Sequence, residues 1–508
     1  MTKKFKTILE MEHDEAKIFF MEPSSYSTVT FPSYIDFSRV LSSSEKALEL
    51  APLNEQIDFS ELRKSEDSSY ILYANKDGNH SWRPFTLIHP WLYVDLVNTI
   101  CEKKNWEKIK NVLLKSKSLK TIRCMSLPLK SLSDDNDTKA TITNWWEQIE
   151  QKQIELALHY NTLLSTDITD CYGSIYTHSI AWAIEGKSIA KVNRSDDLLG
   201  NKIDKSIQNM RQGQTNGIPQ GSKLMDLIAE TVLAAVDVEL EENIKALNLK
   251  HKYEILRYRD DYKIFTEDKL EAEKILKVLT ETLMTWNFKL SDKKTKISEN
   301  IIIDSIKKDK LHWNKYNSFF NSSNIKISIQ KELLEVLKLS QEFPNSGSIS
   351  KALINLYKRR INVLSILPDD YKQLISISTE LMLNNPKVIE TSVAIISKIL
   401  SLIKNKTLEI KNIIEVVYAK VIAKSNSEFT EIWLDRLALP YKINIMSDSR
   451  ICQKVHDDSV MVWDSSWIKG DSKNGKNEQK FGQDIINMDE ISKLEKVIPV
   501  SEIDVFYY

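Results

Sequence analysis

The chain has 508 residues, 42% of them hydrophobic, and its 70 Lys plus Arg against 71 Asp plus Glu give a formal net charge of −1. A chain of this length can bury a large core and predicts about two to four domains. Its charge balance excludes a protein that is basic throughout, so a nucleic-acid path would have to be a local basic patch. The four cysteines, at 101, 124, 171 and 452, form no CxxC pair. Their spacing argues against a zinc site or a disulfide scaffold and fits a reducing cytoplasm.

The amino end carries basic residues, but acidic residues between Glu10 and Glu15 follow where a secretory signal would need an apolar core. No stretch approaches the roughly 18 uninterrupted apolar residues that a membrane helix needs. We therefore expect no export signal, no membrane segment and a cytoplasmic location.

A lysine-dense stretch runs from Lys103 to Lys130 and contains Arg123. Two interpretations stay open. Much of the stretch, around Glu102 to Lys120, has the pattern of a helix with a solvated charged face. Alternatively, the stretch forms a basic wall facing phosphates, with Arg123 and Lys130 in contact with a nucleotide.

From about residue 156 to 300 the pattern alternates strands and helices, which indicates an α/β or α+β unit. Beyond about residue 325, apolar residues recur at three- and four-residue intervals, as from Val393 to Ile403, which is typical of amphipathic helices. Breaks fall near Pro344, Pro368, Asn384-Asn-Pro and Lys404-Asn-Lys. This pattern predicts a stack of antiparallel helices resembling a HEAT-type solenoid. The expected divisions are 1–155, 156–305, 306–460 and a loop with the carboxyl tail over 461–508.

The first motif is an apolar run, Leu163-Leu-Ser-Thr-Asp167, followed by a turn and a helix to about Gly186. We expect a strand that ends at a carboxylate. A strand end is rigid, so a carboxylate there can hold a divalent ion where a triphosphate and an attacking hydroxyl meet. The alternative for Asp167 is a helix N-terminal residue favoured by the macrodipole.

The second motif, from Tyr253 to Phe265, predicts a strand, a two-residue turn and a strand, with Asp260 and Asp261 at the hairpin tip. With Asp167 on a neighbouring strand, the pair could bind two Mg²⁺ ions roughly 4 Å apart. Three clustered carboxylates repel one another, so the cluster makes sense chiefly with cations. The alternative is that Asp-Asp only favours the turn.

Between these motifs lies a glycine-containing loop, Gly217-Ile-Pro219-Gln220-Gly221-Ser222, followed by an amphipathic helix. The two glycines permit close backbone approach, and Ser222 is a natural N-cap. Such a loop could lie against a base pair or a sugar. Taken alone, a glycine-proline turn that opens a helix is common.

Together these segments resemble a known family. The segment from Asp167 to Tyr172 resembles motif A of reverse transcriptases, the Gly217 to Ser222 loop motif B, Tyr258-Arg259-Asp260-Asp261 motif C, and Phe288 to Ile297 the motif D and E region. The resemblance covers roughly residues 60 to 300. It implies an α/β (α+β) fingers-palm polymerase core of reverse-transcriptase type, followed by an all-α helical-repeat (HEAT-like) domain.

The resemblance also implies roles. Asp167, Asp260 and Asp261 become the catalytic ligands of Mg²⁺, with Mn²⁺ as a substitute, and Tyr172 becomes an aromatic gate that would clash with a ribose 2′-OH. Nucleotide contacts are then expected from Gln220, Gly221 and Lys294, besides Lys130 and Arg123. The remaining motif residues are Gly217, Pro219, Ser222, Tyr258 and Arg259.

Three further segments narrow the resemblance to the abortive-infection (Abi) group of bacterial defence reverse transcriptases, in particular the subtype of P2-related prophages: Arg83 to Pro90, Ser126 to Lys130 and Tyr176 to Trp182. This group implies an anti-phage role, a homo-oligomer, and DNA synthesis from dNTPs without a template. A tyrosine hydroxyl of the protein would be the primer, so the single-stranded DNA product would be covalently attached. The primer candidates are Tyr26, Tyr34, Tyr507 and Tyr508, and a phage or host protein would be the trigger.

Two other functions stay open. A conventional RNA-templated reverse transcriptase would use the same carboxylates. A non-catalytic sensor of nucleic acid or of a phage protein could use the same fold, although intact carboxylates argue against it. Small palm-like cyclases typically carry a Gly-Gly hairpin, and the Gly217 to Ser222 loop would then be unexplained.

Overall fold

The structure is a computed structural model that describes residues 5–75, 81–132, 141, 144, 149–195, 197–313, 327–344, 346–469 and 483–504. Two of the predicted primers, Tyr507 and Tyr508, lie outside the described residues, as does most of the predicted loop after Lys469. No helix in these ranges is long and apolar enough to cross a membrane.

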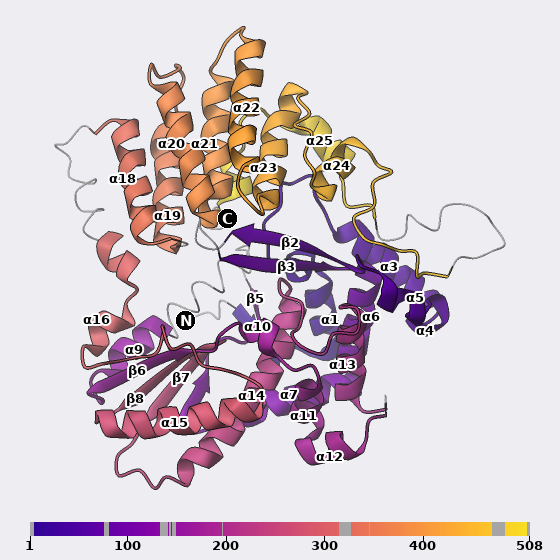
Figure 1. Cartoon of the computed structure of the whole chain (residues 1–508), viewed down its shortest axis with the longest axis vertical. Helices are drawn as coiled ribbons and strands as arrows, with labels where there is room; N and C mark the ends of the chain where they lie inside the picture. Colours follow the sequence, from indigo (N-terminus) through magenta and orange to yellow (C-terminus); the bar gives the residue numbers. More distant parts are fainter. Residues whose placement is uncertain are drawn as a thin grey trace.

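A five-stranded sheet lies in the lower half of the molecule, at the lower left of Figure 1. Its order is β4 (Ile122–Cys124), β7 (Glu254–Tyr258), β8 (Asp261–Thr266), β6 (Thr162–Asp167) and β9 (Lys296–Ser298). Only the β4–β7 pair is parallel. The predicted strand ending at Asp167 and the predicted hairpin are both confirmed. Asp167 is therefore no helix N-terminal residue.

Alternation along the strands gives the sheet two buried faces. Leu164, Ile255 and Ile264 belong to the main core, together with residues of α14 (Lys223–Lys245) and α15 (Lys269–Thr285). A second, small core is formed with α9 (Gln151–Leu156) and α16 (Ile301–Ser305). The strands contribute Leu163, Leu256 and Phe265, which neighbour the three strand residues of the main core along the chain, and the helices contribute Leu156 and Ile301.

The N-terminal part consists of short helices and two small sheets. The helices are α1 (His13–Met21), α2 (Pro23–Tyr26), α3 (Ser38–Leu50), α4 (Leu53–Gln56), α5 (Phe59–Lys64), α6 (Pro90–Cys101) and α7 (Lys103–Lys117). β1 (Phe5–Thr7) pairs with β5 (Leu129–Ser131), and β2 (Ser69–Asn75) pairs with β3 (Trp82–Ile88). In α7 one face buries Trp106, Ile109 and Leu113, while most of its lysines are exposed. The interpretation of a helix with a solvated face is confirmed for this segment.

The segment between β6 and α14 is helical, with α10 (Cys171–Ser174), α11 (His178–Glu185), α12 (Lys187–Val192) and α13 (Leu199–Asn209). The predicted single helix reaching Gly186 is wrong in one respect, because α10 ends at Ser174 and Ile175, with φ −59° and ψ 113°, leaves the helical conformation before α11 begins. Gly186 does end α11, with φ 89°.

The C-terminal half is helical, as predicted. It contains α18 (Ile329–Glu342), α19 (Gly347–Leu356), α20 (Tyr371–Asn384), α21 (Ile389–Ser401), α22 (Thr407–Ile422), α23 (Glu428–Ala438), α24 (Arg450–His456), α25 (Met488–Lys493) and α26 (Val500–Ile503), with single turns η3 (Tyr357–Ile361), η4 (Pro386–Val388) and η5 (Leu439–Tyr441). All four predicted breaks fall between these elements. Helices α18 to α23 stand side by side above the β2–β3 hairpin (Figure 1).

After α24 the chain returns to the N-terminal part, where we call residues 462–469 the strap. The indole N–H of Trp463 donates to the carbonyl of Leu87 (2.8 Å), and the backbone N–H of Asp58 donates to the carbonyl of Trp467 (2.8 Å). Further along, the N–H of Asp36 donates to the carbonyl of Ile485 (2.8 Å). The strap and Ile485 are thus packed against the first 90 residues, whereas Ile498 and Glu502 further along the tail contact Tyr357 and Arg436 of the helical half.

His89 connects the strap to α6. Its Nδ1 accepts from the backbone N–H of Trp91 (3.1 Å), so His89 is the N-cap of α6, and its Nε2 lies 3.1 Å from Ser465 Oγ of the strap. The side chain is 0% exposed, and burial lowers the pKa of His89 to about 3. The imidazole is therefore neutral, with its proton on Nε2.

We predict that acid weakens this connection. The pKa of His89 falls from an ordinary 6.5 to about 3 on folding, so the unfolded chain binds the extra proton between these values. The contribution to stability is complete above pH 6.5 and is lost toward pH 3, by up to about 1.4 kcal/mol per pH unit. Urea unfolding from pH 7 to 4 should show a steeper loss for the native protein than for His89→Asn, which keeps a cap acceptor. If the free energy of unfolding fell equally with pH in both proteins, the assignment of His89 as a buried neutral imidazole would be contradicted.

Candidate active site

The three predicted carboxylates meet at one end of the sheet. Asp167 is the last residue of β6 and stands opposite Asp261, the first residue of β8, in the antiparallel register. The turn joins them as well, since the backbone N–H of Ile168 donates to the carbonyl of Asp260 (3.0 Å). Three residues from two separated segments therefore form one acidic cluster.

The electrostatics of this cluster favour a cation. Burial raises the pKa of Asp260, with a further contribution from Asp167. Partial withdrawal from water and the charges of Asp260 and Asp167 also raise the pKa of Asp261 to about 6, in spite of the nearby Lys263, although its side chain still reaches the surface. Oxygen donors with excess negative charge, fixed at strand ends, suit Mg²⁺ or Mn²⁺.

Lys294 supplies a positive charge to the cluster from within the protein. Its Nζ lies 2.7 Å from Asp167 Oδ2, and this hydrogen bond raises the pKa of Lys294 although burial opposes the rise. The loop that carries Lys294 is joined to β6, because the N–H of Ser291 donates to the carbonyl of Asp167 (2.8 Å) and Thr166 Oγ1 lies 2.7 Å from Thr295 Oγ1. The sequence prediction placed this lysine at the site, and the structure brings it there.

The hairpin tip holds a backbone conformation that L-residues avoid. Arg259 has φ 54°, which costs about 1–2 kcal/mol for a residue other than glycine. Its N–H donates to Ser126 Oγ (2.8 Å), its carbonyl accepts from Arg257 Nη1 (3.0 Å), and its guanidinium lies 2.7 Å from Asp226 Oδ2. These contacts hold the tip, and with it the two aspartates, in place.

Beneath the tip lies a fully buried ion cluster. Arg257 is 0% exposed; its Nη1 lies 2.9 Å from Glu230 Oε2 and its Nε 2.8 Å from Asp237 Oδ2. Ser126 Oγ donates to Glu230 Oε1 (2.5 Å). Burial raises the pKa of Asp237 to about 6. At Glu230 burial acts in the same direction, but the guanidinium and the hydrogen bonds from Ser126, Arg257 and Cys124 together outweigh it and lower the pKa. The cluster joins β7 to α14 and to the segment after β4.

Sequence reasoning missed the members of this cluster, although α14 contains a signal. Asp226, Glu230, Asp237 and Glu241 fall within about 60° of one another at 100° per residue, on the helix face that is otherwise apolar and buried. Buried acidic residues need partners. The pattern therefore predicts basic or N–H groups opposite this face, but it does not name Arg257.

The glycine loop packs on neighbouring segments of the chain. Gly217 has φ 83°, and a Cβ there would lie 2.4 Å from Arg211 Nη1 and 3.0 Å from the carbonyl oxygen of Gly173. A Cβ on Gly221 would lie 3.3 Å from Phe85 of β3, and the carbonyl of Gln220 accepts from the N–H of Thr86 (2.7 Å). Ser222 caps α14 through the N–H of Met225 (3.2 Å), as predicted. The close approach is thus within the chain itself, at Gly217 to Arg211 and Gly173 and at Gly221 to Phe85.

Tyr172 connects the α10 segment to the hairpin tip. Its hydroxyl donates to Asp226 Oδ1, the carboxylate whose other oxygen binds Arg259. Burial and Asp226 raise the pKa of Tyr172 well above its ordinary value. The carbonyl of Tyr172 accepts from the N–H of Ile218 (2.9 Å). The two predicted nucleotide-contacting motifs are therefore side by side.

Arg83 of β3 also faces the site. Burial lowers its pKa, and the nearby Asp260 partly offsets the effect. The predicted nucleotide contacts Arg123 and Lys130 have other partners: Arg123 Nε lies 2.9 Å from Glu254 Oε1, and Lys130 forms an ion pair with Glu22. Glu254 begins β7, at the end of the strand away from the tip. No ion pair between either residue and the three aspartates occurs in the described part of the chain.

The two described primer candidates are buried. Tyr26 is 1% exposed and donates to the carbonyl of Ile88, and Tyr34 is 0% exposed. The expectation that they lie in approachable segments is wrong in this structure, because both aromatic rings belong to the main core.

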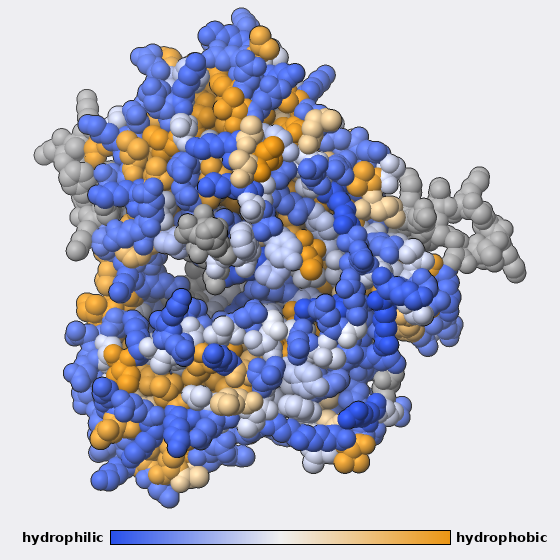
Figure 2. Space-filling model, viewed as in Figure 1, coloured by the Kyte–Doolittle hydropathy of each residue, from blue (hydrophilic) through white to orange (hydrophobic). Residues whose placement is uncertain are grey.

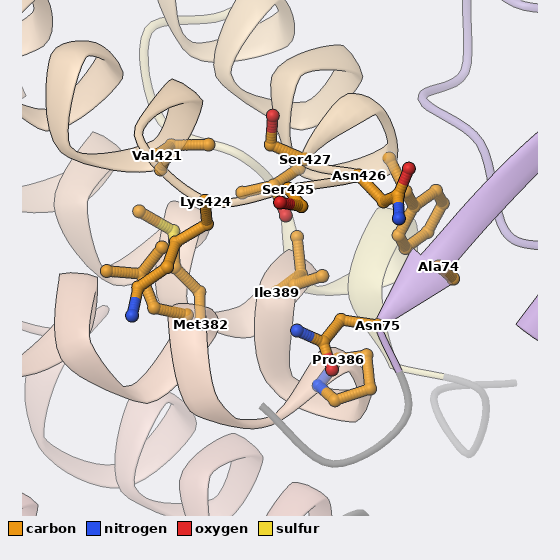
Figure 3. A pocket seen from close by; sticks show the side chains of 13 residues that line it. Ala74, Asn75, Met382, Pro386, Ile389, Val421, Lys424, Ser425, Asn426 and Ser427 are labelled. Atoms are coloured by element: carbon orange, nitrogen blue, oxygen red, sulfur yellow. The ribbon is translucent and has the colours of Figure 1, made fainter. Parts of the chain in front are cut away.

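Two pockets lie away from the aspartates. One lies between the end of β2 and helices α20 to α23, where Asn75 is beside Pro386 (Figure 3). Its cavity volume of about 20 Å³ has room for about one water molecule. A larger groove of about 620 Å³ is lined by Trp182, Lys187, Glu239 and Trp286. The carboxylates instead lie at an open sheet end, with Asp261 exposed, and the drawn face is hollowed between the sheet half and the helical half (Figure 2).

One family match covers the segment that contains the motifs. A family model described as "Reverse transcriptase (RNA-dependent DNA polymerase)" matches residues 75–335. Similar solved structures include telomerase from Candida albicans in complex with a fragment of telomeric RNA (13% identity, TM-score 0.31, covering 70% of this chain and 66% of that chain). Apo telomerase from Candida tropicalis has 13% identity and a TM-score of 0.30, with 77% and 68% covered. The chain thus spans about two thirds of those telomerases, and likeness at this level does not extend to activity. No curated protein matches the chain.

We predict that Arg257→Gln lowers the free energy of unfolding by about 3–5 kcal/mol, because it leaves Glu230 and Asp237 buried without a cation. The control is Arg123→Gln, which removes the exposed ion pair with Glu254 and should cost at most about 1 kcal/mol. Urea unfolding measures both. Equal losses of unfolding free energy in the two variants would contradict the predicted contribution of the buried cluster.

Proposed function

Because the chain belongs to the reverse transcriptase family, we propose that it is a nucleotidyltransferase that makes DNA from dNTPs in a reaction that depends on a divalent metal ion. The observation that carries this proposal is the meeting of Asp167, Asp260 and Asp261 at one sheet end. Asp167 and Asp261 are paired in the antiparallel register, and the pKa values of Asp260 and Asp261 are raised.

In this proposal the three aspartates hold Mg²⁺, or Mn²⁺ as a substitute. Bound there, the ions would activate the attacking hydroxyl and offset the charge of the departing pyrophosphate. Lys294 and Arg83 add positive charge beside the carboxylates. Lys294 would exchange Asp167 for a phosphate oxygen when the metal arrives, which the exposure of its side chain (57%) permits.

Tyr172 would stand next to the sugar of the incoming dNTP and exclude a ribose 2′-OH. Its hydroxyl is occupied by Asp226, so the ring is held in place and its edge is the discriminating surface. Gln220 and Gly221 would border the same nucleotide, since their loop is bonded to the backbone of β3 at Thr86.

We further propose an anti-phage role of the abortive-infection kind, with untemplated, protein-primed synthesis in a cytoplasmic homo-oligomer. This part rests on the motif resemblance, as does a HEAT-like repeat for the helices from α18 to α23. Their side-by-side packing is consistent with it. The proposed division places the polymerase core over 1–305 and the helical part after it.

The primer would be a tyrosine hydroxyl that attacks the α-phosphate of the first dNTP, with release of pyrophosphate. Since Tyr26 and Tyr34 are buried, the carboxyl-terminal Tyr507 and Tyr508 are the preferred candidates. A labelled product that survives denaturation on the native protein, but is absent from a Tyr507→Phe/Tyr508→Phe variant, would support this choice.

The main test is to incubate purified protein with Mg²⁺ and labelled dNTPs, without a template. We expect labelled DNA, and we expect Asp260→Asn/Asp261→Asn to lower incorporation by at least about 100-fold while leaving the circular dichroism spectrum unchanged. EDTA should have the same effect on the native protein. Activity that persists in the double variant would rule out the assigned site.

The same assay separates the alternatives. Product that forms only with added RNA and a primer favours a conventional templated reverse transcriptase. No product under either condition favours a non-catalytic sensor, in which the acidic cluster would bind metal without turnover.

The gate has its own test. Tyr172→Ala should raise incorporation of ribonucleotides relative to deoxyribonucleotides by about tenfold or more, measured as the ratio of kcat/KM values. The control is Tyr172→Phe, which keeps the ring but loses the bond to Asp226 and should retain most of the discrimination. An unchanged ratio in Tyr172→Ala would show that the ring does not face the sugar.

A further inference from the structure

A second group of metal-ligating side chains lies at the other end of the β7–β8 hairpin, away from the aspartates of the tip. His251 precedes β7, and Glu267, Asp268 and Glu271 follow β8 at the start of α15. One donor atom each from His251, Asp268 and Glu271 falls within 4.8 Å of the others.

The donor atoms have the spacing of metal ligands. His251 Nδ1 lies 3.2 Å from Glu271 Oε2 and 3.6 Å from Asp268 Oδ2. The second distance is too long for a hydrogen bond. Ligand atoms bound tetrahedrally at about 2.0–2.1 Å lie about 3.3 Å apart, which is close to both values.

Backbone groups aim the carboxylates at the imidazole. Glu271, which is 4% exposed, accepts with Oε1 from the N–H groups of Lys250 (2.9 Å) and His251 (3.3 Å). Asp268 accepts with Oδ1 from the N–H of Glu271 (2.9 Å) as the N-cap of α15. The second oxygen of each carboxylate is left facing His251. Ligand orientation by hydrogen bonds of this kind is typical of metal sites.

The charges of the group are not balanced within the described residues. His251 Nε2 lies 3.8 Å from Glu267 Oε2, so three carboxylates surround one imidazole, and no Lys or Arg in the described ranges forms an ion pair with any of them. A neutral imidazole has a single N–H. If the proton is on Nε2, on the side of Glu267, the Nδ1 lone pair faces two carboxylate oxygens, and a bound cation would stabilise that arrangement.

We propose that His251 Nδ1, Asp268 Oδ2 and Glu271 Oε2 bind one divalent transition-metal ion of the Zn²⁺ type. Glu267 lies 3.8 Å from Nε2 and would have to move closer to accept from Nε2–H and orient the ring, the arrangement in which a carboxylate supports a metal-bound histidine. Three protein ligands leave a fourth position for water. The imidazole donor selects Zn²⁺ over Mg²⁺, which prefers oxygen ligands.

The ion would join the connection between α14 and β7 to the start of α15, and so hold the base of the hairpin whose tip carries Asp260 and Asp261. This inference does not depend on the proposed function. It also differs from the cysteine-based zinc site that the cysteine spacing argued against, because its ligands come from two segments and follow no cysteine motif.

The test uses the full chain with Asp260→Asn/Asp261→Asn as background, so that the candidate catalytic site does not compete. Metal-free protein titrated with ZnCl₂ in a calorimeter, with 5 mM MgCl₂ present, should bind one Zn²⁺ per chain with a Kd below about 10 µM. Adding His251→Gln should weaken binding at least about tenfold. The matched control is His159→Gln, since His159 is also exposed but lies outside the group, and it should leave binding unchanged.

A second readout keeps the test decisive if a variant folds poorly. Co²⁺ bound in place of Zn²⁺ should give visible ligand-field absorption in the background protein, and His251→Gln should abolish it while the metal-free far-ultraviolet spectrum stays the same. Glu271 is not substituted, because it also caps the backbone. Zn²⁺ binding that is absent, or equal in His251→Gln and its parent, would overturn the proposal.

Discussion

The buried guanidinium of Arg257 determines how the site is assembled. Ile255 and Arg257 lie on the same face of β7, so the charge points into the core toward α14 and must be neutralised there. Glu230 and Asp237 neutralise it, and Arg257 Nη1 also donates to the carbonyl of Arg259. One side chain thus fixes the helix, the sheet and the strained tip relative to one another. Such a cluster is costly to break but adds little net stability, so its main effect is positional.

A second chain of polar contacts extends from this cluster to Tyr172, on the side where we propose that the nucleotide binds. Asp226, one turn before Glu230, binds both Arg259 and the hydroxyl of Tyr172. The tip, the proposed aromatic gate and the start of α14 are therefore coupled through one carboxylate. The carboxylates that would bind metal remain at the open sheet end, balanced by Lys294. The buried cluster holds the tip rigidly, and Lys294 is a cation that can exchange its partner. A site that is to accept metal and triphosphate together needs both properties.

Several site features were predictable because they depend on short-range pattern. The apolar run before Asp167, the alternation around Asp260 and the N-cap at Ser222 each occupy fewer than about ten residues, and the strands, the hairpin and the cap are confirmed. The breaks between C-terminal helices followed from proline and asparagine in the same way. The wrong predictions concern position in space. Tyr26 and Tyr34 are in the core, and α10 and α11 are separate helices.

The sequence by itself determined the elements, the order of the motifs and the kind of chemistry, since strand period, turn composition and capping act between neighbours in the chain. Only the tertiary structure decided which charges pair. Arg257 with Asp237, Tyr172 with Asp226, and His251 with Glu271 are separated by 20, 54 and 20 residues. Whether a charge is buried, and which partner then neutralises it, depends on packing of distant segments. The acidic residues on the buried face of α14 indicated that basic or N–H partners were needed, and only the fold shows which groups these are.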